Sequence, residues 1–260
     1  KTVKNGYDVP PVTSHQTEDL YFLPTSSTGD IMHRKYYSLS YSEAHEQAEW
    51  VAYELTREQL NVKWVERQDN FRPDPTIKTE SASPQDYRRS GYDRGHLVPV
   101  ADRSFSFEAM DETFFMSNIS PQEHHFNGGI WRELEENTRN WAKKFKRLYI
   151  VSGPVFPKGS GKTIGQNEVT VPEAYFKVVL DITEPELKGI AFLIPNQISY
   201  KPISHYAVSI DEVEAITGLN FFPTLLSEEL EAELEQNFDS NLWPLSQKKY
   251  NLRLEKWNNW

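Results

Sequence analysis

Residues 92–127 form the segment around which the chain is organised. The segment opens with YDRGH at 92–96, continues through MSNISPQ at 116–122 and ends with FN at 126–127. A neutral imidazole can take a proton from water near neutral pH, and an amide oxygen can bind a hard divalent cation that keeps several water ligands. These residue types would allow His96 to activate a water molecule and Asn127 to hold a divalent metal.

Each of these residues also has a simpler explanation, which the residues alone favour. A lone histidine is more often structural than catalytic, and Asn127 could be only the N-cap of the helix expected over residues 127–147. Gly95 is expected to relieve the backbone and let a substrate approach closely. Glu135 lies about 12 Å further along that helix, too far to share an ion with Asn127 directly. It would hold a metal-bound water, unless it is simply a solvated glutamate.

Length and composition limit the class of protein. The chain has 260 residues, of which 38% are hydrophobic, enough for one large domain or two small ones. No apolar run reaches the roughly 18 residues of a membrane span, and no signal-peptide pattern is seen at the start. Because the first residue is Lys rather than Met, we expect the chain to be either a trimmed piece or a processed product. The absence of cysteine excludes disulfides, thiolate nucleophiles and Cys-ligated metals.

The net charge of −10 argues, by itself, against binding to nucleic acid. The distribution of charge is uneven, however, because residues 139–147 (RNWAKKFKR) carry five basic side chains and no acid. A local basic groove on an acidic protein is therefore expected if the substrate is a polyanion. Trp141 and the lysines around it fit either a nucleic-acid face or an amphipathic helix whose aromatic side chains pack inward.

The hydrophobic patterns predict an α+β fold with a mixed or antiparallel sheet. We expect an irregular N-terminal arm over residues 1–34 and a single domain over 35–260. The expected elements are a helix after the capping box at residues 40–43, a strand over 61–68, a helix over 127–147, a strand over 148–151 that ends in a turn at 153–154, a hairpin of strands 175–180 and 189–194, a helix from Ser209 to Gly218, and a tail from residue 227 that is helical and then irregular.

Two other motifs are weak candidates for function. His124 and His125 could suggest a transition-metal pair, but adjacent residues do not readily face one site and no third ligand is evident nearby. Residues 158–162 (KGSGK) lack the spacing of a phosphate-binding P-loop and are expected at a hairpin tip.

Four ordered motifs resemble those of the DNA/RNA non-specific endonucleases, a family with the ββα-metal fold. DRGH at 93–96 is similar to the family signature, and SNISPQ at 117–122 to its S-N-x-x-P-Q segment. Asn127 begins a match to the helix N-x₃-W-x₂-L-E, and residues 67–74 resemble the upstream element R-x₃-F-x-x-D. Residues 175–178 and 209–218 also look like family elements, so the resemblance covers about residues 35–225.

The resemblance implies a role for each matching residue. His96 would be the general base, and Asn127 the only direct protein ligand of Mg²⁺, for which Mn²⁺ or another divalent cation could substitute. Glu135 would orient a water bound to the metal, Arg94 would lie beside the scissile phosphate, and Asn118 would set hydrogen bonds in the site.

An arginine of the upstream element would stabilise the transition state. Arg67 is preferred for this role, with Arg72 as the alternative. Some relatives carry a further active-site asparagine four residues before Asn118, where this chain has Phe114. That departure puts the local hydrogen-bond network in question.

The implied function is a metal-dependent, sequence-non-specific endonuclease that leaves 5′-phosphate and 3′-hydroxyl ends on DNA and RNA. The resemblance also implies export to the periplasm or the medium, and it allows an inhibitor protein or a homodimer as partners; a membrane is not expected as one. Two rivals stay open. One is a binding protein that has lost catalysis, suggested by Phe114 and the net acidity, and the other is an esterase for small phosphodiesters.

Overall fold

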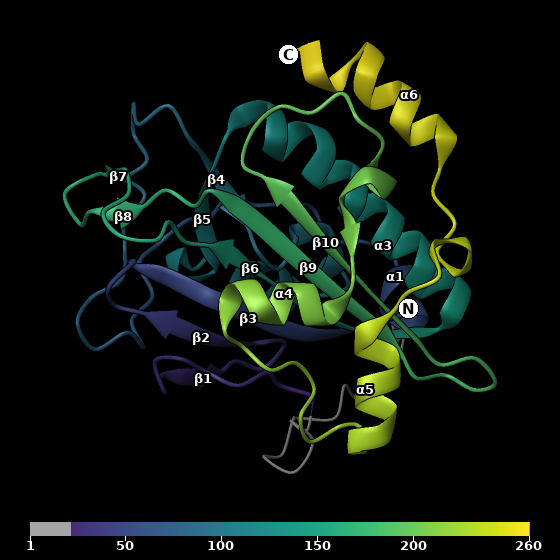
Figure 1. Ribbon diagram of the computed structural model, residues 1–260. Helices are drawn as coiled ribbons and strands as arrows, with labels where there is room; N and C mark the ends of the chain where they lie inside the picture. The colour runs from purple at the N-terminus through teal and green to yellow at the C-terminus, as the bar shows by residue number, and fades with distance from the viewer. Residues whose placement is uncertain (1–21, 260) are drawn as a thin grey trace, which may run out of the picture.

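The central element of the computed structural model is a seven-stranded sheet in which every neighbouring pair is antiparallel (Figure 1). The structure describes residues 22–259. The strand order is β1-β2-β3-β6-β9-β10-β11. These strands are β1 (Ile31–His33), β2 (Ser38–Ser42), β3 (Gln47–Thr56), β6 (Arg147–Val155), β9 (Ala174–Asp181), β10 (Lys188–Pro195) and β11 (Ala207–Val208).

Two small ribbons and the helices complete the fold. The ribbons pair β4 (Asp93–His96) with β5 (Ile119–Gln122), and β7 (Thr163–Ile164) with β8 (Val169–Thr170). The α-helices are α1 (Arg57–Asn61), α2 (Phe107–Glu112), α3 (Arg132–Phe145), α4 (Ile210–Thr217), α5 (Glu228–Gln236) and α6 (Gln247–Glu255). Short 3₁₀ turns are η2 (Val100–Asp102), η3 (Met116–Asn118), η5 (Ile203–Tyr206), η6 (Ser240–Leu242) and η7 (Trp257–Asn259), and η4 (Phe126–Trp131) is a π-helix.

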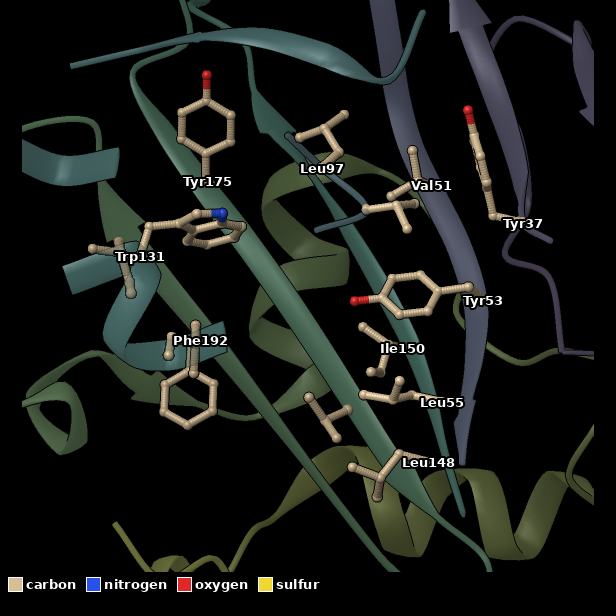
Figure 2. Packing of buried hydrophobic residues seen from close by; sticks show 14 of the residues in the cluster. Tyr37, Val51, Tyr53, Leu55, Leu97, Trp131, Leu148, Ile150, Tyr175 and Phe192 are labelled. Atoms are coloured by element: carbon tan, nitrogen blue, oxygen red, sulfur yellow. The ribbon is translucent and has the colours of Figure 1, made fainter. Parts of the chain in front are cut away.

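The large sheet packs against other elements on both faces. Successive side chains of a strand point to opposite sides, so one strand contributes to both cores. On β3, Tyr53 and Leu55 face a core cluster shared with Leu134 and Trp141 of α3 (Figure 2 shows part of this cluster). The opposite face packs against α4 and α5, whose contributions include Ile210, Val213 and Leu234. Figure 1 shows α4 lying across the near face of the sheet. This arrangement places α3 and the β4–β5 ribbon on the same side of the sheet.

The helix predicted after residues 40–43 is wrong. Residues 38–56 instead form the β2–β3 hairpin, and Ser40 lies within β2, where its Oγ donates to Glu49 Oε1 at 2.6 Å. The ten residues of β3 are nearly all buried, so the strand has apolar side chains on both faces. Such a continuous apolar run cannot be told from a helix by its periodicity alone, which is why the spacing of Ala48, Val51 and Leu55 was misleading.

The strand predicted over residues 61–68 is also wrong. The helix α1 ends at Asn61, and the chain then runs as a surface segment outside any ladder. Its backbone is anchored where Val65 N–H donates to Ser104 O at 2.9 Å. Trp64 is 46% exposed, so the alternation of apolar and polar residues does not reflect a buried face. The segment instead runs along the site described below.

Several predicted elements are confirmed. The helix over 127–147 corresponds to η4 followed by α3, and the hairpin of 175–180 with 189–194 corresponds to β9 and β10. The Ser209 capping box begins α4, and Gly218 ends it with a φ of 75°. The tail begins with the predicted helix, α5, but the irregular end is wrong, because the chain becomes helical again in α6. The ion pair of Arg253 with Glu133, 2.5 Å from Nε to Oε2 and fully buried, holds α6 against α3.

Three details differ from expectation. Strand β6 continues through Gly153 and Pro154 instead of turning there; a Cβ on Gly153 would lie 2.3 Å from Glu49 O. Residues 158–162 precede β7, whereas the tip of the β7–β8 hairpin is at 165–168. The predicted N-terminal arm includes β1, which pairs with β2, while residues 1–21 lie outside the described part. The division into an arm and a single domain at residue 34 stays a prediction.

None of the helices in residues 22–259 combines the length and the apolar character that crossing a bilayer would require.

Candidate active site

The β4–β5 ribbon brings two of the sequence motifs together. DRGH forms β4 and pairs with ISPQ of β5 in the register Gly95 to Ser120 and His96 to Ile119. A Cβ added to Gly95 would lie 2.2 Å from the side chain of Gln122. Gly95 therefore leaves space for the Gln122 side chain. The packing does not support the expectation that Gly95 lets a substrate approach closely.

Asn127 lies in the π-helix η4, which follows the ribbon and leads into α3. Its N–H donates to Glu123 O at 2.8 Å, so Asn127 is already inside the helical hydrogen-bond pattern. The capping contact comes from Glu123, whose Oε2 accepts from Phe126 N–H at 2.8 Å. Asn127 is thus not the N-cap, and its side chain is available for another role. Short π-helices of this kind are frequent at functional sites.

Asp93 at the start of β4 holds the Asn127 side chain. The Asn127 amide Nδ2 donates to Asp93 Oδ2 at 2.9 Å, and Asp93 also contacts His124 Nδ1 at 3.0 Å. Because the amide nitrogen is committed to Asp93, the Asn127 Oδ1 is turned elsewhere, and no hydrogen bond to it is found among the described residues. A fixed, unshared amide oxygen suits a hard divalent cation.

His96 lies in an aromatic surround. Its ring packs edge-to-face on Phe114 with a centroid distance of 5.2 Å and lies 5.4 Å from the Phe71 ring. The Nε2 atom is enclosed and has no hydrogen-bond partner in residues 22–259. Burial, with the nearby charges of Arg67 and Arg94, lowers the pKa of His96 from 6.5 to about 3. The imidazole is therefore neutral and able to accept a proton.

Phe114 supplies part of that apolar surround rather than a polar group. The side chain is fully buried and meets Phe71 edge-to-face at 5.0 Å. The guanidinium of Arg67 lies 5.6 Å from the centre of the Phe114 ring. Phe114 thus packs against the base and lies under one of the arginines that lowers the pKa of His96.

The side-chain amide of Asn118 forms its hydrogen bonds with backbone atoms, some of them close to His96 in the chain. Its Oδ1 accepts from Val98 N–H at 2.9 Å, and its Nδ2 donates to Val98 O at 3.1 Å and Thr113 O at 2.9 Å. The side chain is completely buried. It therefore fixes the chain just after β4 and has no donor left to offer a substrate.

The two candidate arginines occupy different environments. Arg72 is engaged, because its Nη2 lies 2.6 Å from Asp111 Oδ2 and its guanidinium stacks on Phe115 at 4.0 Å. Within residues 22–259, Arg67 forms an ion pair only with the exposed Asp69, at 2.7 Å, and it lines the cavity beside His96. Arg94 lines the same cavity and stacks on Phe71 at 4.1 Å. The geometry favours Arg67 over Arg72 as the arginine that faces a substrate.

The predicted site residues converge on one cavity of about 600 Å³, with Asn118 as the exception. His96, Asn127 and Glu135 all line it. Its basic lining residues outnumber the two acidic ones, Glu135 and Glu136. The basic residues are Arg67, Arg94, Arg132, Arg139, Lys143 and Lys249. This acidic protein therefore has a locally basic groove, as a polyanionic substrate requires.

Glu135 lies next to a network of buried charged side chains. Burial raises its pKa, while the neighbouring Arg139 and Lys177 oppose that rise. Arg139 Nη1 in turn lies 2.9 Å from Asp102 Oδ1, and Asp102 Oδ2 accepts from Tyr53 Oη at 2.8 Å. Glu135 and Asn127 line the same cavity, and carboxylate and amide oxygens are hard donors, so the residues present fit a hard divalent cation.

Arg139, Asp93 and Trp64 are among the residues at or next to the cavity that were missed as site residues from the sequence. Arg139 follows Glu135 by one helical turn, a spacing that could have indicated it. Asp93 stands within the DRGH motif itself. Trp64, which also lines the cavity, was masked by the wrong assignment of its segment to a strand.

Of the remaining candidate residues, some pack in the core and others line the cavity. Trp141 is buried, and its Nε1 donates to Pro244 O at 2.8 Å, while Lys143 lines the cavity. The helix thus has an inward aromatic face and a basic outer edge. His124 contacts Asp93, and neither His124 nor His125 belongs to a cluster of potential metal ligands within residues 22–259.

Comparison with known proteins identifies the chain's relatives. Residues 20–228 match the family described as DNA/RNA non-specific endonuclease. The chain is 38% identical to a nuclease of Nostoc sp. over 235 residues, covering 84% of this chain and 82% of that protein. It is 36% identical to the mitochondrial nuclease EXOG of Danio rerio over 207 residues, covering 74% of this chain and 60% of that protein. The chain thus spans less than two thirds of the EXOG relative.

A solved structure supports the fold. The structure described as "Crystal structure of the EndoG/EndoGI complex: Mechanism of EndoG inhibition" matches with a TM-score of 0.71 and 32% identity, covering 75% of this chain and 86% of that chain. The predicted α+β fold of the ββα-metal type is therefore confirmed, with β4, β5 and the η4–α3 helix as its ββα unit.

Proposed function

Because the chain belongs to the DNA/RNA non-specific endonuclease family, we propose that it is a divalent-metal-dependent nuclease that hydrolyses phosphodiester bonds in DNA and RNA. The observation that carries the proposal is the meeting of His96, Asn127 and Glu135 in one basic cavity. The relatives' names, which include an endonuclease and nucleases, support the same reaction class.

His96 acts as the general base in this proposal. Its neutral imidazole, with Nε2 unpartnered, takes a proton from the attacking water. Arg67 and Arg94 face the scissile phosphate and balance the charge that develops on its oxygens. Cleavage of the bond to the 3′-oxygen leaves a 5′-phosphate and a 3′-hydroxyl end.

Asn127 would hold the metal through Oδ1, with Asp93 fixing the amide and Glu135 orienting the ion's water ligands. We propose Mg²⁺ as the ion, and Mn²⁺ or another hard divalent cation as a substitute. When bound, the cation supplies Lewis-acid stabilisation of the phosphate and of the leaving oxygen.

Low sequence specificity follows from the character of the groove. Its charged lining suits phosphate contacts, which carry no information about base sequence. DNA and RNA are therefore both proposed as substrates. An inhibitor protein is a proposed partner, since the similar solved structure is described as a complex that explains inhibition, and a homodimer is the other partner proposed from the family resemblance.

The family resemblance suggests export to the periplasm or the medium. Several relatives, among them EXOG of Danio rerio and endonuclease G of Homo sapiens, are named as mitochondrial, and that compartment is the alternative. Fractionation of the source cells decides between them.

The deciding experiment is plasmid nicking with Mg²⁺, with and without EDTA, by the wild type and His96→Ala. Removing the base should lower kcat by about 10²–10⁴-fold, whereas His205→Ala, an exposed histidine outside the cavity, should cleave normally. Cleavage by His96→Ala at the wild-type rate would remove His96 from the mechanism.

A second variant addresses the metal. Asn127→Ala should weaken binding of Mg²⁺ in a calorimetric titration while the circular dichroism spectrum stays unchanged. Unchanged metal affinity would count against Asn127 as the ligand.

Substrate size separates the enzyme from its two rivals. A wild-type protein that hydrolyses an activated model phosphodiester but leaves plasmid intact would be the small-ester esterase. A protein that binds DNA but cleaves neither the model ester nor plasmid in the presence of Mg²⁺, Mn²⁺ or Ca²⁺ would be the binding protein. The intact pair of His96 and Asn127 favours the nuclease over both.

A further inference from the structure

Three carboxylates meet at the junction of α4 and α5, on the opposite face of the large sheet from the cavity. Asp211 and Glu214 belong to α4, and Glu235 lies in the last turn of α5. One carboxylate oxygen from each lies within 4.8 Å of the other two. The cluster involves neither His96 nor Asn127, and Glu235 lies beyond residue 228, where the family match ends.

Glu235 distinguishes this cluster from an ordinary acidic surface. Its side chain is only 3% exposed, and its buried Oε1 has no hydrogen-bond partner in residues 22–259. An unpaired buried carboxylate is costly, because desolvation is not offset by any donor. A carboxyl group buried beside two other carboxylates therefore either keeps a proton or takes a positive partner.

The protein does not provide that partner from residues 22–259. No ion pair there involves Asp211, Glu214 or Glu235. The last turn of α5 carries no basic residue, so the partial negative charge of the helix end adds to the carboxylates. Burial and the charges of Glu214, Glu231 and Asp211 raise the pKa of Glu235 to about 9, which reflects the same missing cation.

We propose that Asp211, Glu214 and Glu235 bind a calcium-sized divalent cation that ties α5 to α4. Calcium binds carboxylate oxygens at about 2.3–2.6 Å, so oxygens up to about 5 Å apart can share one ion. Mg²⁺ prefers about 2.0–2.1 Å and near-octahedral geometry, which would require the three groups to close further. Glu214 keeps one oxygen for the ion, since its Oε1 accepts from Phe221 N–H at 2.7 Å. Water completes the coordination.

The site is structural. It lies where Leu234 of α5 and Ile210 of α4 pack on the sheet; a Cβ on Gly189 of β10 would lie 3.1 Å from Leu234 O and 2.8 Å from Ile210 Cδ1. A cation there would neutralise the repulsion between the two helices and hold α5 on the sheet. Cation binding should therefore raise the melting temperature and leave the cleavage mechanism unchanged.

The test is calcium titration of the full chain after removal of metals with EDTA, followed by calorimetry. The wild type should bind one Ca²⁺ in addition to any ion in the cavity. Its melting temperature should rise by about 5–8 °C at a calcium concentration near a hundred times the Kd. Asn127→Ala, which lacks the cavity ligand, should keep this rise. MgCl₂ should give a much smaller rise in the same protein.

Glu235→Gln should abolish the calcium-dependent rise, and Asp211→Asn should do the same. Asp211 is exposed, so its substitution carries the test even if Glu235→Gln does not fold. The matched control is Glu233→Gln, an exposed glutamate on α5 outside the cluster, which should respond as the wild type does. Absence of a calcium-dependent rise in the wild type, or its survival in both cluster variants, overturns the proposal. An equal response to Mg²⁺ overturns the assignment to a calcium-sized ion.

Discussion

The Asn127 amide nitrogen donates a 2.9 Å hydrogen bond to the Asp93 carboxylate, and this bond joins the first residue of β4 to the π-helix before α3. The contact links two motifs that are 34 residues apart in the chain. It determines which end of the amide points away from β4. Orientation of a metal ligand by a neighbouring carboxylate is a common way to tune affinity.

Asp93→Ala should therefore weaken metal binding at the cavity by about 10–100-fold without unfolding the protein. Calorimetric titration with Mn²⁺ measures this effect, in an Asp211→Asn background so that only the cavity contributes. Asp30→Ala removes an exposed aspartate elsewhere and should leave the affinity unchanged. An Asp93→Ala protein with wild-type affinity would show that Asn127 needs no orienting partner.

The pH profile should reflect the lowered pKa of His96, about 3 in the free protein. A base with a lowered pKa stays unprotonated as the pH falls, so kcat/KM should show no acid limb near 6.5. In the complex, the negative phosphate offsets the charges of Arg67 and Arg94, and the pKa should rise. The acid limb of kcat should therefore lie at a higher pH than that of kcat/KM. Because the pKa of Glu135 is raised to about 7 and could also shape the profile, the decisive measurement is an NMR titration of the His96 ring in the free protein, and a midpoint near 6.5 there would contradict this environment for His96.

Arg67→Ala and Arg72→Ala should separate activity from stability. Arg67 faces the cavity, so its loss should lower kcat/KM by about 10²-fold or more with little change in unfolding by urea. Arg72 pairs with Asp111 and stacks on Phe115, so its loss should lower the free energy of unfolding by about 1–3 kcal/mol and change kcat much less. The reverse pattern would assign the phosphate contact to Arg72.

Trp64 should serve as a stacking surface for an unpaired base, since its indole is 46% exposed at the cavity wall. Trp64→Ala should weaken binding of a labelled single-stranded oligonucleotide by about 10-fold in fluorescence anisotropy, measured in EDTA to prevent cleavage. Duplex binding should change less, because paired bases are already stacked. Trp64→Phe should restore most of the affinity, and Phe107→Ala, at an exposed aromatic outside the cavity, should have no effect. Equal losses for single and double strands would argue against stacking.

The basic lining of the cavity should make affinity for DNA strongly dependent on salt, despite the net charge of −10. Lys143→Ala should reduce the slope of log affinity against log salt concentration by about 1. Lys144, its exposed neighbour outside the cavity lining, provides the control, and Lys144→Ala should keep the wild-type slope. A flat salt profile in the wild type would contradict the groove.

Local patterns correctly predicted the elements that are buried on one face or that have capping residues at their ends. Helix α4 was found because Ser209 and Glu212 cap it and Gly218 ends it. The same logic failed for β3, because burial on both faces hides the alternation that marks a strand. Trp64 likewise gave an alternating pattern in a segment that pairs with no other strand.

The sequence by itself determined the ββα-metal fold and the cavity residues His96, Asn127 and Glu135, because ordered motifs specify both residue type and spacing. Only the tertiary structure decided which partner each of the other side chains contacts. It committed the Asn118 amide to the backbone, paired Arg72 with Asp111, and placed Glu235 beside Asp211 and Glu214. Those relationships depend on contacts between residues far apart in the chain, and no local pattern records which partner a side chain meets.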